Sequence, residues 1–385
     1  MAVQKACFLI ADISGYTNYL TQVELDHAED ILADLMNAVV SALRPPFSLA
    51  KLEGDAAFTY SLGETVDGSL LQDTIERTYF AFRSRLRDID SATTCECNAC
   101  SRMSTLDLKF VVHYGQTIIQ TVADSEELVG PDIILVHRLL KNAVDEKIGD
   151  HAYALFSNDC LRAASIDPAA NELVEHHEEI DAIGDVTAWI KDLELAWQHE
   201  NEHRRVLVSR EDTALLVEGD TTAPRSMVRA YCALPEHRPK WQGSQGLTEV
   251  HANGRRGAGT TNHCMHGANT VIEHILDWRP QDYMTLTSHF DVPGSAPLTM
   301  SMVFADLPDG GTHVEVRIAE PTEEARAYFE ASKPTYEENY RKGFEVLREI
   351  IENHPEHDLV IGEPRLRNPG RRHIDEPVNA GSSHA

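Results

Sequence analysis

Apolar and polar positions follow two different periods along the first half of the chain. Short apolar runs such as Cys7–Ala11 and Leu106–Tyr114 are typical of strands, whereas residues 18–43 and 69–89 repeat apolar positions every three to four residues, as amphipathic helices do. The other expected elements are strands at Phe47–Leu52, Ala56–Tyr60, Gln116–Val122 (pairing back on Leu106–Tyr114), Tyr153–Phe156, Glu175–Ile183 and Gly184–Leu193, and a helix at Pro131–Asn142. The pattern predicts an α+β domain over residues 1–193.

The pattern changes after residue 193. Residues 194–205 are charged and are expected to form a linker. The elements expected beyond them are a strand at Ala214–Gly219, a short helix at Pro224–Leu234, antiparallel strands between Leu247 and Ile318, and a long amphipathic helix at Thr322–Asn353. We therefore expect a second domain over residues 206–353 and a disordered tail over residues 354–385, which are rich in Pro, Gly, Ser and charge.

Composition limits the class of protein. Of the 385 residues, 42% are hydrophobic and 25% are charged, as in globular proteins, and the formal net charge of −28 argues against a nucleic-acid-binding surface. No apolar run approaches the roughly 20 residues that span a bilayer, and Met1 leads directly into the first strand without a signal-peptide pattern. A cytoplasmic protein is expected.

Two short motifs carry the candidate chemistry. Phe8-Leu-Ile-Ala-Asp12-Ile-Ser-Gly-Tyr-Thr17 reads as a strand, a tight turn and a helix, and Lys51-Leu-Glu-Gly-Asp55 reads as the turn of a hairpin. Each motif places one aspartate beside a glycine at the end of an apolar run. Carboxylates are the oxygen ligands that Mg²⁺ prefers, and glycines let a phosphate approach the backbone. Alternatively, Asp12 caps a helix and Gly54-Asp55 is an ordinary hairpin turn.

Together, these motifs resemble those of the class III nucleotidyl (adenylate and guanylate) cyclases, whose catalytic domain has a ferredoxin-like βαββαβ core. The resemblance implies that Asp12, Asp55 and the carbonyl of Ile13 bind Mg²⁺ or Mn²⁺, and that Lys51 reads the base of a purine nucleoside triphosphate. It also implies a homodimer, because cyclase sites of this class form between two chains. The residues whose amides it assigns to the phosphates are Ser14, Gly15, Tyr16 and Thr17.

The chain departs from the cyclase pattern at the residues that assist the reaction. In Gly130-Pro-Asp-Ile-Ile134-Leu-Val-His-Arg138, Arg138 stands at the position of the transition-state arginine, but Ile134 replaces the ribose-binding asparagine. A shift of one turn would bring Asn142 or His137 there instead. Glu127 replaces the aspartate that partners adenine, and no phosphate-binding lysine occurs near residues 180–184. Since one lost transition-state contact costs roughly 10²–10³ in rate, ordinary cyclase activity is in doubt.

Three of the seven cysteines lie together as Cys95-Glu-Cys97-Asn-Ala-Cys100. Thiolates at this spacing can share one Zn²⁺, with His113, His151 or a second subunit as the source of a fourth ligand. Alternatively, they are three reduced thiols in a polar loop.

The second domain resembles the START-like helix-grip fold, also called polyketide-cyclase-like or SRPBCC. The strand, short helices, antiparallel strands and long final helix carry this resemblance, together with the segment Thr221-Thr-Ala-Pro-Arg…Val228-Arg-Ala-Tyr…His237…Trp241. It implies a curved sheet around a long helix, with a cavity for a lipid or another hydrophobic small molecule. Four histidines fall on or near its strands, either as a metal site or as a polar rim: His263, His266, His274 and His289.

Three hypotheses follow for function. The first is a signalling or regulatory protein in which a divergent cyclase-like domain binds nucleotide and metal under the influence of a hydrophobic-ligand domain. The second is a catalytically inactive pseudo-cyclase that dimerises and senses a ligand. The third is that the second domain is itself an enzyme for a small apolar substrate and the first domain is regulatory.

Overall fold

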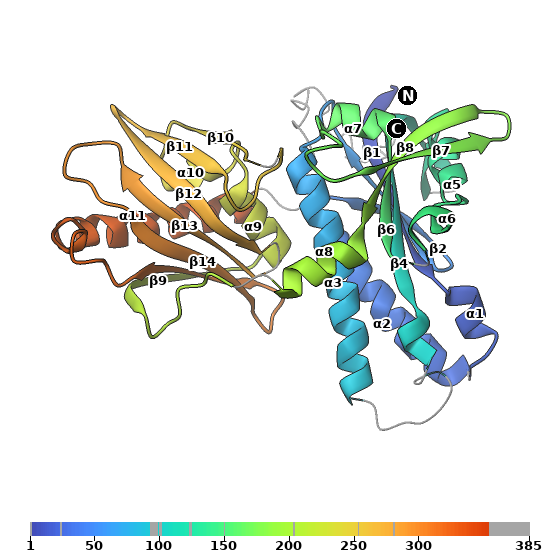
Figure 1. Ribbon diagram of the computed structural model, residues 1–385, viewed down its shortest axis with the longest axis horizontal. Helices are drawn as coiled ribbons and strands as arrows, with labels where there is room; N and C mark the ends of the chain where they lie inside the picture. Colours follow the sequence, from blue (N-terminus) through green and yellow to red (C-terminus); the bar gives the residue numbers. More distant parts are fainter. Residues whose placement is uncertain are drawn as a thin grey trace, which may run out of the picture.

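The chain forms two α+β domains, each built on its own sheet (Figure 1). The computed structural model describes residues 2–23, 25–92, 99, 102–122, 125–149, 151–202, 205–252, 254–279 and 282–353. The predicted cysteines Cys95, Cys97 and Cys100 and the predicted tail 354–385 lie outside these residues. Among the described helices, none combines the length and the apolar character that crossing a membrane requires.

The first domain holds an eight-stranded sheet. Its elements are β1 (Gln4–Ser14), α1 (Tyr16–Leu20), α2 (Leu25–Leu43), β2 (Ser48–Glu53), β3 (Ala56–Leu62), α3 (Gly68–Ala92), the 3₁₀ helix η1 (Met103–Thr105), β4 (Asp107–Val122), β5 (Ser125–Val129), α5 (Pro131–Leu139), α6 (Asp145–Ile148), β6 (Tyr153–Ser157), α7 (Asn158–Ala163), β7 (Val174–Ile180), β8 (Gly184–Asp192) and α8 (Leu193–Glu202). The strand order is β2-β3-β1-β4-β6-β8-β7, and β5 pairs with β4. The β1-α2-β2-β3-α3-β4 segment therefore has the antiparallel order expected of a βαββαβ core.

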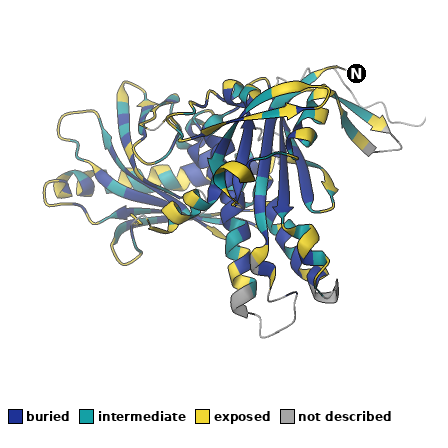
Figure 2. Ribbon diagram, turned by 45° about the vertical axis from the view of Figure 1, so that its right-hand side comes forward, coloured by how far each residue is buried: buried dark blue, intermediate teal, exposed yellow. Residues whose placement is uncertain are grey.

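The two faces of this sheet bury different helices, because β1 alternates its side chains. Cys7, Leu9 and Ala11 pack in one cluster with α2, α3 and α7. Phe8 and Ile10 pack in another cluster with Val136 and Leu139 of α5. The central strands are almost wholly buried between these layers (Figure 2). We call the second side of the sheet the α5 face.

Two local predictions for this domain are wrong. The expected helix over residues 18–43 is divided, since α1 ends at Leu20 and α2 begins at Leu25. Gln116–Val122 does not pair back on Leu106–Tyr114, because β4 runs without interruption through Gly115 and β5 supplies the returning strand. Gly115 is needed there for space: a Cβ on it would lie 2.4 Å from the carboxyl carbon of Asp132. Within the segment 194–205, which the sequence predicts to be a linker, the structure forms most of the helix α8.

The second domain is a seven-stranded antiparallel sheet with helices on it. Its elements are β9 (Thr213–Thr221), α9 (Arg225–Ala233), α10 (Arg238–Gln242), β10 (Gly246–Val250), β11 (Thr261–His266), β12 (Asn269–Arg279), β13 (Tyr283–Phe290), β14 (Leu298–Asp306), β15 (Thr312–Ala319) and α11 (Arg326–Asn353). The strand order is β10-β11-β12-β13-β14-β15-β9. The first strand of this domain in the sequence, β9, therefore lies at one edge of the sheet and pairs with the last strand, β15.

Helix α11 lies close against this sheet because two glycines leave room for aromatic rings. A Cβ on Gly219 of β9 would meet the ring of Phe344 at 2.9 Å, and a Cβ on Gly343 would meet Trp241 at 3.1 Å. The rings of Trp241 and Phe344 are stacked with their centroids 6.1 Å apart. This end of α11 is therefore seated directly on β9 and α10.

Candidate nucleotide and metal site

Asp12 and Asp55 come from two segments that the sheet holds side by side. Asp12 lies near the end of β1 opposite Ala56, and Asp55 occupies the turn between β2 and β3. The amide of Ile13 donates to the carbonyl of Asp55 at 3.0 Å, which fixes the turn to the end of β1. Burial raises the pKa of Asp12, and the charge of Asp55 adds to this rise while Lys109 opposes it. The two carboxylates therefore lie within electrostatic range of each other.

The lysine beside this pair was missed by sequence reasoning. Lys109 of β4 is directly opposite Asp12 in the ladder, and its Nζ lies 3.2 Å from Oδ2 of Asp12. The run Leu108-Lys-Phe-Val-Val-His113 could have indicated a cation on a central strand, but its partner is distant in sequence. The cation offsets part of the charge of the carboxylate pair, and a lysine there can also contact a phosphate.

The turn after β1 depends on glycine. Gly15 has φ +82°, in the left-handed region, and a Cβ on it would lie 2.9 Å from the carbonyl oxygen of Thr105. Its own carbonyl accepts from Tyr19 at 2.9 Å, which closes the first turn of α1. The amides at the start of a helix have no partner within the helix. The predicted phosphate-binding residues Ser14–Thr17 therefore span the end of β1, the turn at Gly15 and the start of α1.

Lys51 and Glu127 are also near each other. Lys51 Nζ forms an ion pair with Glu53 at 2.9 Å. The hydrogen bond to Glu53 raises the pKa of Lys51 although burial opposes it, and the charges of Glu53 and Glu127 add to the rise. Glu53 also faces His137 of α5, whose Nε2 lies 3.0 Å from Oε2 of Glu53. The hairpin that carries Asp55 is thus tied to α5 through Glu53.

Arg138 belongs to the surface of α5. It is exposed on α5 and lines a surface hollow with Ile133, Ile134, His137 and Lys141. Among the residues that the structure describes, it makes no ion pair with either carboxylate. Ile134, which replaces the expected asparagine, is 59% exposed on the same helix.

His113 is a buried part of the sheet. Its exposure is 1%, its Nδ1 lies 2.8 Å from the hydroxyl of Ser157, and its Nε2 lies 3.3 Å from Asp132. The contact with His113 lowers the pKa of Asp132 although burial opposes it, and the hydrogen bond from the amide of Gln116 adds to the lowering. Because Ser157 also caps α7 by accepting from the amide of Cys160, this group ties β4 to α5 and α7.

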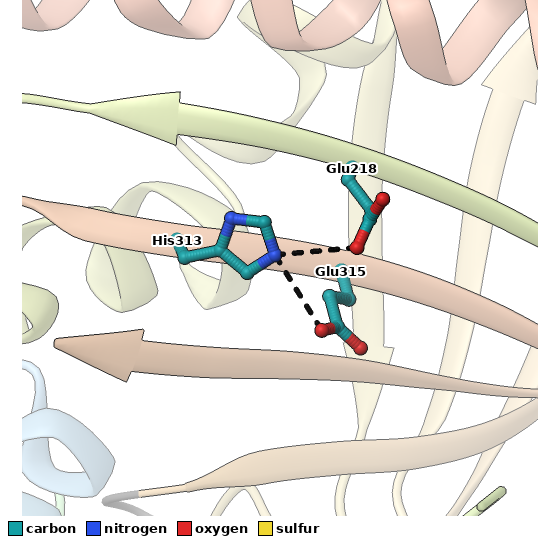
Figure 3. A group of neighbouring side chains, drawn as sticks. All are labelled: Glu218, His313 and Glu315. Atoms are coloured by element: carbon teal, nitrogen blue, oxygen red, sulfur yellow. Dashed lines mark ion pairs between the residues drawn. The ribbon is translucent and has the colours of Figure 1, made fainter. Parts of the chain in front are cut away.

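A separate group of possible metal ligands lies on the outer surface of the second sheet. Nε2 of His313 is 3.5 Å from Glu218 and 3.4 Å from Glu315 (Figure 3). Arg210 Nη2 already lies 2.5 Å from an oxygen of each glutamate, and Arg317 also pairs with Glu315. Arginine cations therefore balance this group without a metal. Within the described residues, none of the four histidines singled out from the sequence belongs to a group with metal-ligand geometry: His263, His266, His274 and His289.

Residues 32–148 match a family model. Its description is a protein of unknown function, DUF2652, and the matched segment includes Asp55, Lys109 and Arg138 but not Asp12. The uncharacterized protein Rv2561/Rv2562 of Mycobacterium tuberculosis is 40% identical over 113 residues, which are 29% of this chain and 52% of that protein. The chain thus spans about half the length of this curated relative.

Similar solved structures include two cyclases. The guanylyl cyclase Cya2 is 12% identical with a TM-score of 0.38, over 49% of this chain and 92% of that one. The adenylyl cyclase CyaB from P. aeruginosa is 13% identical with a TM-score of 0.34, over 50% of this chain and 95% of that one.

Proposed function

We propose that the first domain binds a purine nucleoside triphosphate together with Mg²⁺ or Mn²⁺, and that the second domain regulates it. The single observation that carries this proposal is the group of Asp12, Asp55 and Lys109 at the end of β1. Carboxylate oxygens are hard ligands that suit either Mg²⁺ or Mn²⁺, and the carbonyl of Ile13 offers a further oxygen beside the carboxylates.

Each residue of the group has a role in this proposal. Asp12 and Asp55 hold the cation, which when bound neutralises charge on the phosphates. The turn at Ser14–Thr17 offers backbone amides to the β- and γ-phosphates, and Lys109 offers an ammonium beside them. Lys51 and Glu127 form a donor–acceptor pair for the base.

Cyclisation needs a second chain in this proposal. Arg138, the arginine that would stabilise the developing charge, makes no ion pair with either aspartate among the described residues, and in this proposal it acts on the site of a partner copy. The hollow on α5 and the exposed side chain of Ile134 on the same helix support contact with such a copy on this side of the domain.

The replacement of asparagine by Ile134 supports a second candidate function, nucleotide binding without turnover. An isoleucine cannot hydrogen-bond a ribose hydroxyl, and removal of one such contact costs roughly 10²–10³ in rate. In this alternative the first domain is a dimerisation and sensing module.

For the second domain, we propose a small amphipathic ligand between α11 and the sheet. Arg238 and Glu273 form a buried bidentate pair there, with both hydrogen bonds at 2.7 Å. Within the described residues, Nε of Arg238 and Oδ1 of Asn262 are buried without a hydrogen-bond partner, so a polar group of a ligand could satisfy them. The alternative that this domain is itself an enzyme would need further convergent polar groups.

One experiment separates these functions. The purified chain is incubated with ATP or GTP and Mn²⁺, nucleotide binding is measured by calorimetry, and cyclic products are sought by mass spectrometry. Binding that Asp55→Ala abolishes, with product formed, supports a cyclase; the same binding without product supports the sensing module. Binding or activity that persists in Asp55→Ala contradicts the metal assignment.

A further inference from the structure

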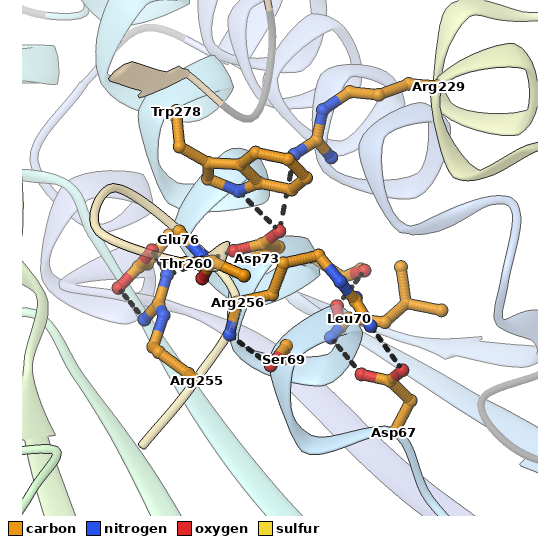
Figure 4. Close-up of polar contacts among 12 residues, drawn as sticks. Asp67, Ser69, Leu70, Asp73, Glu76, Arg229, Arg255, Arg256, Thr260 and Trp278 are labelled. Carbon is orange, nitrogen blue, oxygen red and sulfur yellow. Dashed lines mark hydrogen bonds and ion pairs between the residues drawn. The ribbon is translucent and has the colours of Figure 1, made fainter. Parts of the chain in front are cut away.

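A buried group of charges joins the two domains on the side of the first sheet opposite the α5 face (Figure 4). Asp73 and Glu76 lie one turn apart on α3, and Arg255 of the β10–β11 loop bridges them. Its guanidinium donates to both oxygens of Glu76, at 2.9 and 2.7 Å, and to Asp73 at 3.0 Å. We call this group, with the partners named below, the α3 clamp.

Asp73 receives two further contacts from the second domain. Arg229 of α9 lies 3.3 Å from its Oδ2, and the indole N–H of Trp278 donates to the same oxygen at 2.9 Å. The guanidinium of Arg229 also lies over the Trp278 ring, 4.9 Å from its centroid. The side chains of Arg229 and Asp73 are only 5% and 3% exposed. A single carboxylate of α3 thus orients an arginine and a tryptophan of the other domain.

The charges of the clamp balance across the interface. Lys191 of β8 pairs with Glu76 at 2.5 Å from the side of the first domain. Burial alone would raise the pKa of Glu76, but Arg255 and Lys191 hold it below its usual value. Arg256 completes the clamp by pairing with Asp67 at 3.2 Å, while Glu249 of its own domain pairs with it at 2.6 Å. Removing Arg255 would leave Glu76 with Lys191 alone and Asp73 with Arg229 and Trp278, so the buried carboxylates would be only partly compensated, which is destabilising locally.

The next residue of α3 links the clamp to the candidate site. Arg77 Nη2 donates to the carbonyl of Ala42 at 2.5 Å and to that of Pro45 at 3.2 Å. These carbonyls mark the end of α2 and the segment that leads into β2. Since β2 and β3 form the hairpin with Asp55 at its turn, α3 connects the second domain to the position of that carboxylate.

We infer that α3 couples the two domains: the contacts that the second domain makes with Asp73 and Glu76 hold the β2–β3 hairpin in place. The chain of contacts runs from Arg255 through α3 and Arg77 to the end of α2 and the hairpin. This inference requires no nucleotide, so it stands or fails independently of the proposed function.

Hydrogen–deuterium exchange of the full chain, without nucleotide or metal, tests this coupling. In Arg255→Ala we expect backbone amides of residues 56–62 in β3 to exchange about tenfold faster, while amides of α11 keep wild-type rates. Arg255→Lys, which keeps the charge but loses the bidentate contact, should restore part of the protection. The matched control is Arg341→Ala, which removes an exposed arginine of α11 and should change neither region.

Two results would overturn the inference: faster exchange confined to the β10–β11 loop and α3, or an equal increase in α11 that indicates global destabilisation. If Arg255→Ala does not fold, Trp278→Phe removes the indole N–H that donates to Asp73 while it keeps an aromatic ring beside Arg229 and all the charges of the clamp. It should give a smaller increase in the same β3 amides, and wild-type rates there would count against coupling.

Discussion

The buried pair of Arg238 and Glu273 allows a quantitative test of the second domain. Glu273→Ala would leave the guanidinium of Arg238 in the interior, where the two side chains are only 3% and 5% exposed. Burial lowers the pKa of Arg238, but Glu273 more than compensates and holds the pKa above its usual range. Two charge-assisted hydrogen bonds at 2.7 Å are each worth about 1.5–3 kcal/mol, so the variant should lose about 3–5 kcal/mol.

The assay is urea denaturation followed by tryptophan fluorescence and circular dichroism, fitted with a separate transition for each domain. Glu337→Ala is the matched control, because its ion pair with Arg341 on α11 has side chains that are 44% and 63% exposed. That control should cost about 0.5 kcal/mol or less. Replacing both partners, as Arg238→Met with Glu273→Leu, should recover most of the loss, since no buried charge then remains unpaired. The reasoning is refuted if Glu273→Ala costs no more than the control, or if the double variant is as unstable as Glu273→Ala.

Three further predictions concern the first domain. In EDTA, Asp12→Asn should raise the melting temperature at about pH 8 and lose this advantage at about pH 4. The reason is that a carboxyl whose pKa is raised in the folded state destabilises the fold only when it is ionised. An equal shift of the melting temperature at both pH values would contradict this. Lys109→Ala should strengthen binding of Mn²⁺ alone about threefold and weaken binding of a nucleoside triphosphate about tenfold in calorimetry, since the ammonium competes with one and attracts the other; changes in the same direction would count against its role. Gly68→Ala should cost about 1–3 kcal/mol in denaturation, because its Cβ would lie 2.5 Å from the carbonyl oxygen of Ala164, whereas Gly257→Ala, which has open space around it, should be close to neutral.

The α+β class and the contexts of the two aspartate motifs could be predicted because both depend on local patterns. The end of β1 and the β2–β3 turn lie where apolar periodicity and glycine placed them. Lys109 could not be found in this way, since its relation to Asp12 exists only through the β1–β4 register. Likewise, Gly115 and Gln116 resembled a turn locally, yet a contact with the distant Asp132 explains why glycine continues the strand.

The contacts between the domains had no local signal. Asp73 and Glu76 look like ordinary polar positions of an amphipathic helix, and Arg255 and Arg256 look like a charged loop. The charged residues after 193 suggested a linker. The structure shows that they form most of α8 and that Tyr79 of α3 donates to Glu194 of this helix at 2.9 Å, a contact with the first domain that the charge pattern did not predict. Charge alone does not distinguish a solvated surface from a paired interface.

Because the second domain packs against α3, it leaves the α5 face of the first sheet, in the part of the chain that the structure describes, free of contact with it. If two chains met through that free layer, their C-terminal domains would point outward at opposite extremes of the assembly. Each could then receive its own effector without steric competition from the other. Regulation and assembly would use separate surfaces of one sheet, and a substitution on one surface could alter the first property while leaving the second intact.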